Sequence, residues 1–306
     1  MLAASEGDAN MYYATGLFVP DPFTYIEQNG TTVLIMSDLE IDRAKAHSKA
    51  NTVLSLTAYQ NRLKERGLKS PKLTDVVAEV LKERGIRSVL VPATFPVGYA
   101  DQLRGKGFSV RSKADPFFEE RTVKSAQEIA HISDVSRHTE SAMRAAIAAI
   151  SQATVRDGLL YGPDGVLTAE AIKRLISVHL LERDYIAQHT IIACGVQGCD
   201  PHNQGSGPLR AGQPIILDVF PKSAHTGYYA DITRTVVKGR ASDALKRVYD
   251  TLLATQELVF GRVKDGVEGQ DVHREVEEFF KQSGYETGEI NGRMQGFFHG
   301  TGHGIG

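Results

Sequence analysis

Residues 214–239 constrain the fold of this chain more than any other segment. They read PIILDVFPKSAHTGYYADITRTVVKG, two apolar and β-branched runs separated by a stretch rich in turn-forming residues. This pattern predicts an antiparallel β-hairpin. Each run carries one acidic residue, Asp218 in the first and Asp231 in the second, at a place where a carboxylate is not expected. The chain is therefore expected to hold two carboxylates on neighbouring strands of one sheet.

A hairpin centred between Ala224 and His225 would set Asp218 directly opposite Asp231. Opposed residues share one face of a sheet, with Cβ atoms about 5 Å apart. Two carboxylates at that separation repel each other unless a cation lies between them or one of them keeps a proton. A divalent cation is the simplest solution, because hard oxygen ligands suit it. The alternative is structural: one Asp pairs with Arg234 or a lysine, and the other faces water.

Two histidines near the C-terminal end, His299 and His303, stand in the run HGTGHGIG. Its four glycines disfavour a helix, so this is not the helical H-E-x-x-H zinc motif. Glycine allows close approach of the backbone to a ligand, and neutral imidazole is a common metal ligand. The alternative is a glycine-rich turn with incidental histidines. Together with Asp218 and Asp231, however, the run predicts a site of two carboxylates and one imidazole.

His202 lies in the polar turn CDPHNQGSGPL, which precedes the first of the two strands. A single histidine in such a turn is more often a surface residue than a catalytic one. The hairpin tip at His225 is too far from the paired carboxylates to share their metal. Surface, helix or loop positions are predicted for His47, His131, His138, His179, His189, His225 and His273.

The composition of the 306 residues limits the class of protein. Two domains are expected from this length, and 42% hydrophobic and 24% charged residues are ordinary for a globular protein. A net charge of −2, without interleaved basic and aromatic residues, predicts no nucleic-acid or membrane partner. No apolar run approaches a membrane span, and the N-terminus lacks the features of a secretory signal. Only Cys194 and Cys199 occur, which fits a reducing cytoplasm.

Residues 1–122 alternate short β-branched runs with helical stretches. Strands are predicted over residues 31–37, 87–93 and 107–112. The segment LTDVVAEVLKERG spaces its apolar residues as a helix does and ends at Gly85, a usual helix terminator. This order predicts an α/β domain with a largely parallel sheet. The Pro- and charge-rich segment ADPFFEERTVKS, at residues 114–125, marks the domain boundary.

Residues 123–306 begin with a predicted long helix. Its apolar stripe is expected to consist of Ile129, Ile132, Thr139, Met143, Ala146 and Ile150. A second helix, TAEAIKRLISVHLLERDY, and a strand, HTIIACG, precede the hairpin. Two further amphipathic helices are predicted over residues 242–263 and 270–283, the first lined by Leu245, Val248, Leu252 and Val259. No G-x-S-x-G elbow or Walker-type phosphate loop accompanies these elements.

These segments resemble the pita-bread metallopeptidases, the family of aminopeptidase P and prolidase (Xaa-Pro dipeptidase), and more distantly methionine aminopeptidase and creatinase. The specific parts are ILDVFPKSAHTGYYADITRT and FFHGTGHGIG. The segment DANMYYATGLFVPDPF is similar to the N-terminal domain of creatinase and aminopeptidase P, and RTVKSAQEIAHI to the linker and first helix of the catalytic domain. The resemblance implies a creatinase-like α/β domain over residues 1–122 and an α+β pita-bread domain over residues 123–306.

Residue by residue, the resemblance implies that Asp218 chelates one divalent metal ion, that Asp231 bridges two and that His303 binds the other. It further implies that His202 lies near the scissile bond and that His299 contacts the substrate or its oxyanion. Manganese is the first expectation for both ions, with cobalt and zinc as alternatives. The family completes its site with two glutamates that the resemblance places beyond Gly306. The pita-bread domain is therefore expected to be truncated, and inactive by itself.

The activity that the resemblance implies is metal-dependent hydrolysis of an N-terminal peptide bond. The substrate would be a short peptide with proline at the second position, and the enzyme a cytoplasmic homodimer. Two alternatives stay open. The chain could be a catalytically dead pita-bread module that only binds, although such relatives usually lose metal ligands. It could also be a creatinase-like hydrolase of carbon–nitrogen bonds, although that reaction needs no metal and the Asp pair is retained.

Overall fold

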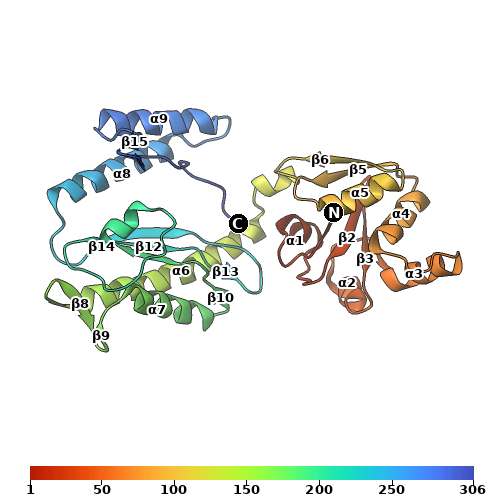
Figure 1. The fold of residues 1–306 in the computed structure, drawn as a ribbon, viewed down its shortest axis with the longest axis horizontal. Helices are drawn as coiled ribbons and strands as arrows, with labels where there is room; N and C mark the ends of the chain where they lie inside the picture. The colour runs from red at the N-terminus through yellow and green to blue at the C-terminus, as the bar shows by residue number, and fades with distance from the viewer. The chain divides into compact units, whose positions relative to one another are not determined.

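The computed structural model describes all 306 residues, which divide into two compact units, Met1–Val123 and Lys124–Gly306. This division falls one residue from the boundary expected from the sequence. The first unit has two clusters of buried hydrophobic residues and the second has one. Figure 1 shows the elements of both units as a ribbon. None of the helices combines the length and apolar character needed to cross a bilayer.

The first unit contains a four-stranded sheet and a separate pair of strands. The sheet has the order β1 (Leu2–Ala3), β2 (Phe23–Gln28), β3 (Thr31–Met36) and β4 (Thr52–Ser55). Strands β5 (Ser88–Pro92) and β6 (Ser109–Lys113) form the pair. The β3–β4 and β5–β6 ladders are parallel, whereas β1–β2 and β2–β3 are antiparallel. The three predicted strands are confirmed, but the four-stranded sheet is not largely parallel.

The antiparallel β2–β3 pair follows from a two-residue turn. Gln28 pairs with Thr31, and between them Asn29 and Gly30 have φ of 52° and 76°. Two successive residues at positive φ form the tight turn that matches the twist of a hairpin, and Asn-Gly is its preferred sequence. The Asn29–Gly30 dipeptide is therefore the sequence signal for this hairpin. The predicted strand–helix–strand order did not include it.

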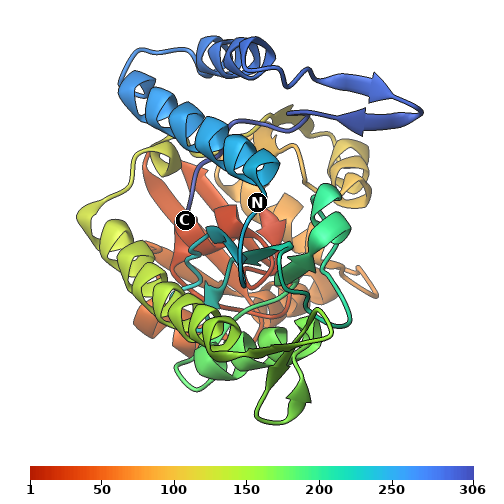
Figure 2. The same cartoon turned by 90° about the vertical axis from the view of Figure 1, so that its left-hand side faces the viewer.

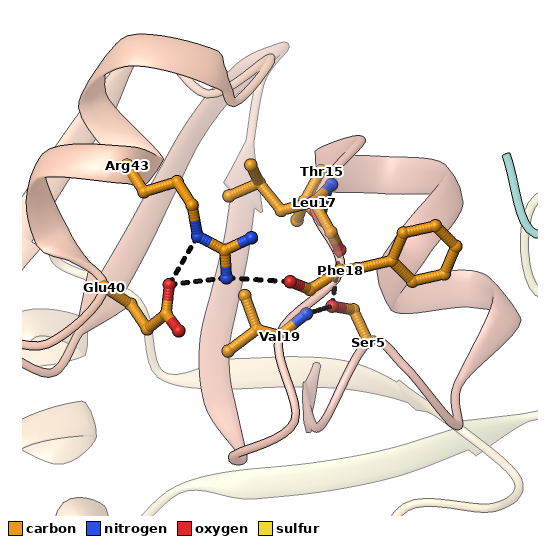
Figure 3. Close-up of polar contacts among 7 residues, drawn as sticks. All are labelled: Ser5, Thr15, Leu17, Phe18, Val19, Glu40 and Arg43. Atoms are coloured by element: carbon orange, nitrogen blue, oxygen red, sulfur yellow. Dashed lines mark hydrogen bonds and ion pairs between the residues drawn. The ribbon is translucent and has the colours of Figure 1, made fainter. Parts of the chain in front are cut away.

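Helices and tight loops complete the first unit. The helices are α1 (Ala9–Thr15), α2 (Ile41–His47), α3 (Leu56–Glu65), α4 (Leu73–Glu83) and α5 (Val97–Gly105), followed by the 3-10 turn η1 (Glu119–Thr122). As predicted, α4 buries its apolar residues and the chain leaves it at Gly85, where φ is 67°. The loop after α1 is fastened by Arg43, which donates to Phe18 O at 2.8 Å, and by Ser5, which bonds to Leu17 and Val19 (Figure 3).

The core of the second unit is a three-stranded antiparallel sheet covered by two helices. Strand β12 (Pro214–Val219) lies between β11 (Ile191–Cys194) and β14 (Ile232–Val237). Helices α6 (Ala126–Gln152) and α7 (Ala169–Leu181) pack beneath it (Figure 1). The shared core consists of Val135, Ala142, Met143, Ala146, Ile150, Ala153, Leu160, Ala169, Ile172, Ile176, Leu180, Tyr185, Ile192, Leu209, Ile215, Leu217, Val219 and Ala230.

The long helix α6 is present as predicted, but its buried stripe differs in part. Ser125 and Glu128 form a capping box that fixes its first turn. The buried side chains begin at Val135, and Ile129 is 53% exposed. The predicted stripe is therefore wrong at Ile129, because the first turns of α6 extend past the sheet. The minor elements around this core are β7 (Thr154–Arg156), β8 (Leu159–Gly162), β9 (Gly165–Val166), β10 (Tyr185–Ile186), η2 (Gly195–Cys199) and β13 (Lys222–Ser223).

The last part of the chain forms a separate layer of the second unit. It comprises α8 (Asp243–Arg262), α9 (Gly269–Gln282) and the hairpin of β15 (Gly288–Ile290) and β16 (Arg293–Gln295), all visible at the top of Figures 1 and 2. Both predicted helices are confirmed. Helix α9 buries Val272, Val276 and Phe280, whereas α8 buries only Thr255. Two members of the predicted α8 stripe, Val248 and Leu252, are exposed.

Candidate metal centre

The register of the hairpin differs from the predicted one by one residue at its centre. Asp218 pairs with Thr233, so it does not lie directly opposite Asp231. The isolated bridge between Lys222 and Tyr229 continues the same register. The hairpin is therefore centred between His225 and Thr226, and the predicted direct opposition of the two aspartates is wrong.

The turn itself explains this register. Ser223 N donates to Tyr228 O at 2.9 Å, which closes a loop of four residues. Inside the loop, Ser223 Oγ accepts hydrogen bonds from the backbone N of His225 and Thr226, at 3.3 and 3.1 Å. Gly227 has φ of 74°, and its N donates to Ser223 O at 3.0 Å. The Ser223 hydroxyl binds the backbone N–H groups of the turn, and Gly227 takes the left-handed conformation. Together they decide where the strands begin to pair.

The shifted register keeps both carboxylates on one face of the sheet. Asp231 stands just before β14, two positions from Thr233, which is the partner of Asp218. Side chains alternate with a period of two, so Asp231 and Asp218 are diagonal neighbours, and such neighbours lie about 7–8 Å apart. Burial raises the pKa of the Asp218 carboxyl above its ordinary value; the hydrogen bond from Thr233 opposes this rise, and the charge of Asp231 adds to it.

His303, near the C-terminal end of the second unit, contacts this face of the sheet. Its Nε2 lies 3.4 Å from Asp231 Oδ2, and its Nδ1 lies 2.9 Å from Gly304 O. A carbonyl oxygen can only accept a hydrogen bond, so Nδ1 carries the proton and, in the neutral ring, Nε2 presents its lone pair to Asp231. A backbone carbonyl that fixes the ring in this way is the usual arrangement around a metal-binding histidine.

The distance between these two atoms suits a shared cation. A lone pair and a carboxylate oxygen repel each other unless the ring is protonated or a positive ion lies between them. Two ligands of one ion, each about 2.1 Å from it, are roughly 3.0–3.4 Å apart, depending on the geometry. The Asp231–His303 pair fits that spacing, and oxygen with imidazole nitrogen is a donor set that divalent transition metals accept.

The described residues supply only part of a complete centre. No group of three or more His, Cys, Asp or Glu side chains is gathered closely enough to hold a metal ion by itself. Asp231 contacts His303, and Asp218 stands beside Asp231 on the sheet with Thr233 as its hydrogen-bond partner. The structural alternative is not observed, since neither aspartate pairs with a lysine or an arginine, and Arg234 instead donates to Thr233 O.

A few contacts hold the segment that carries His303. His273 Nδ1, on α9, lies 2.8 Å from Thr301 Oγ1. The ring of Phe297 stacks on Phe280 with centroids 5.0 Å apart. Thr287 Oγ1 both accepts from Phe297 N at 2.9 Å and donates to Phe297 O at 3.0 Å. From Phe297 to Gly306 the chain has no helix or strand, so these contacts, and not a ladder, position the imidazole.

The other two predicted site histidines are not brought to the carboxylates. His202 is exposed, and its backbone N donates to Asp200 Oδ1 at 3.1 Å. His299 is also exposed, with Nδ1 2.8 Å from Gly300 O. No hydrogen bond or ion pair joins either ring to Asp218 or Asp231. Their predicted roles in substrate binding stay predictions.

Thr233 is the site residue that the sequence reasoning missed. Its hydroxyl donates to Asp218 Oδ1 at 2.6 Å. The signal was available in DITRT, because the period of two places Thr233 on the same face as Asp231. Only the correct register, however, identifies it as the partner of Asp218.

Comparison with known proteins identifies the family of the chain. Residues 130–306, more than half of the chain, match the family model of metallopeptidase family M24. The chain belongs to metallopeptidase family M24.

Relatives and solved structures extend the likeness to the first unit. The chain is 27% identical over 225 residues to the Xaa-Pro dipeptidase of Pyrococcus horikoshii, a match that covers 72% of this chain and 58% of that protein. It is 24% identical over 300 residues to the Xaa-Pro dipeptidase of Pyrococcus furiosus, covering 97% and 75%. The structure of an Xaa-Pro dipeptidase from Bacillus anthracis superposes with a TM-score of 0.79 at 18% identity, covering 98% of this chain and 76% of that one. The fold is therefore the predicted one, an α/β N-terminal domain followed by an α+β pita-bread domain.

Proposed function

We propose that this chain carries the metal-binding face of a metal-dependent peptidase that hydrolyses N-terminal peptide bonds. The observation that carries the proposal is the 3.4 Å approach of the His303 lone-pair nitrogen to the Asp231 carboxylate, beside a second carboxylate on the same sheet face. Membership of metallopeptidase family M24 supports it. The preferred substrate is a short peptide with proline at the second position, and the relatives that are Xaa-Pro dipeptidases support this preference.

Each site residue has a separate role in this proposal. Asp218 would hold one ion, Asp231 would bridge two, and His303 would bind the second. Bound divalent ions polarise the scissile carbonyl and bring the pKa of a bound water toward neutrality. His202 and His299 would donate hydrogen bonds to the tetrahedral intermediate and to the leaving nitrogen. Manganese is our proposal for the ions, with cobalt and zinc as alternatives, because a mixed carboxylate and imidazole set accepts all three.

The compartment and assembly belong to the same proposal. Cys194 and Cys199 are both free thiols, which supports a reducing, cytoplasmic location. We propose a homodimer, which light scattering can check directly. Only Asp231 and His303 contact each other, and no third ligand is gathered around them, so we expect residues 1–306 to bind metal weakly and to hydrolyse Xaa-Pro peptides poorly or not at all.

The test is calorimetric titration of residues 1–306 with Mn²⁺. Asp231→Asn removes the carboxylate that contacts His303, and we expect binding to fall by at least about 100-fold because the bridging ligand is lost. Asp184→Asn is the matched control, since it breaks another exposed Asp–His contact, 3.2 Å from His225. Equal Mn²⁺ affinity in the Asp231→Asn variant would contradict the proposed centre. Tight metal binding by a protein that carries a complete ligand set yet cleaves no peptide would favour the binding-module alternative.

A further inference from the structure

Thr233 makes the only side-chain hydrogen bond to Asp218. The two residues are directly paired across the β12–β14 ladder, and Thr233 Oγ1 donates to Asp218 Oδ1 at 2.6 Å. This distance is typical of a charge-assisted bond from a hydroxyl to an ionised carboxylate. The Asp218 side chain has no ion pair and no other hydrogen-bond partner in the structure. A single donor therefore determines how this carboxylate is turned about its Cβ–Cγ bond.

The pairing of β12 with β14 does not depend on this hydroxyl. Thr233 is exposed, so water can satisfy its hydroxyl, and the backbone bonds of the β12–β14 ladder hold the strands together. A β-branched side chain of the same shape would suit the strand equally well. The hydroxyl does oppose the rise in the pKa of Asp218 that burial and Asp231 cause. The effect of the bond is thus concentrated on one carboxylate, not on the sheet.

We propose that Thr233 is a positioning residue of the metal centre, which holds the Asp218 carboxylate through Oδ1 in the orientation in which it would bind an ion. The inference rests on the proposed function, because it assigns Thr233 a role toward the metal that Asp218 would hold. Partners that orient a ligand typically change metal affinity by about 10-fold to 100-fold when they are removed. Thr233 touches neither substrate nor ion, and acts only through Asp218.

The experiment compares three variants of residues 1–306 with the wild type in Mn²⁺ titrations. Thr233→Val removes the hydroxyl and keeps the shape, and we expect it to weaken the affinity about 10-fold. Thr233→Ser keeps the hydroxyl and should stay within about 2-fold of the wild type, since the same bond can form. Thr235→Val is the matched control: Thr235 is exposed on the same strand and face, opposite Ile216, and should change nothing.

Urea unfolding in a chelator supplies the second readout. The positioning role predicts that metal-free Thr233→Val still unfolds in one cooperative transition, as Thr235→Val does, and loses only the stability of its single bond to Asp218. A loss of cooperative unfolding confined to Thr233→Val would show that the sheet depends on this hydroxyl and would overturn the inference. Wild-type affinity in Thr233→Val, or equal weakening in Thr233→Ser and Thr233→Val, would also overturn it. Absence of Mn²⁺ binding by the wild type would instead overturn the proposed function, and the inference with it.

Discussion

The two halves of the candidate centre come from regions that are packed very differently. Asp218 belongs to a sheet whose side chains Ile192, Ile215 and Leu217 are fully buried against α6 and α7. His303 belongs to the layer of α8 and α9, where Leu252 is 48% and Phe260 71% exposed. The first region determines side-chain direction by burial and by a regular ladder. The second positions its imidazole through a small number of local contacts.

The sheet is held in one register more strongly than the His303 segment is held in one conformation. A fully buried Leu or Ile side chain contributes about 1.5–3 kcal/mol, so the sheet has a strong reason to keep one register. A register slip of one residue would turn its apolar set outward. The irregular segment around His303 has no comparable constraint, so its amides should open to exchange more readily than those of the sheet.

The free energy of unfolding should respond very differently to truncation of a leucine in each of these two regions. Leu217→Ala removes a fully buried side chain beside Asp218 and should lower the free energy of unfolding by about 3 kcal/mol. Leu252→Ala, on the exposed face of α8, should change it by less than about 0.5 kcal/mol. Urea unfolding followed by circular dichroism measures both. Similar losses in the two variants would mean that α8 is as well packed as the sheet.

A smaller effect is expected from the contact that holds the His303 segment. Thr301→Val removes the hydroxyl that bonds to His273, and a hydrogen bond of this kind contributes about 1 kcal/mol. The exchange of amide hydrogens in residues 297–306 should therefore accelerate by about 5-fold, while β12 is unaffected. Hydrogen exchange read by mass spectrometry checks this, with Thr251→Val on α8 as the control. Unchanged exchange would show that the Thr301–His273 bond does not hold the segment.

The smallest effect concerns the charge on Asp218 in the metal-free protein. Its pKa is raised above the ordinary 3.8, chiefly by burial, so the folded chain holds this proton more tightly than the unfolded chain. Stability from this group is complete at low pH and is lost as the pH rises through the raised pKa. Asp218→Asn should therefore be more stable than the wild type at pH 7 and lose that advantage near pH 3.

Chelator-treated protein unfolded with urea at both pH values measures this difference. Asparagine still accepts the hydrogen bond from Thr233, so the comparison isolates the charge. A variant that is less stable than the wild type at pH 7 would contradict the assigned direction of the pKa shift. Added Mn²⁺ should reverse the order, because only the ionised aspartate binds it.

Several features could be predicted from the sequence for identifiable reasons. The helix at residues 73–83 follows from the spacing of Val76, Val80 and Leu81 and from Gly85. The common face of Asp218 and Asp231 follows from parity, which a shift of the hairpin centre by one residue preserves. The stripe of α6 was misjudged at Ile129, because periodicity shows which side is apolar but not where the covering sheet ends.

Most of the helices, the division into two parts and the candidate Asp and His residues could be predicted, because local periodicity and turn chemistry act over a few neighbouring positions. The pairing of Thr233 with Asp218 and the approach of His303 Nε2 to Asp231 became visible only in the folded chain. The first depends on how the Ser223–Gly227 turn closes, and the second on the packing of a segment distant in the chain. The approach of His303 to Asp231 is set by the packing of the whole unit, which no local pattern contains, whereas the register combines the local turn with burial of the apolar face.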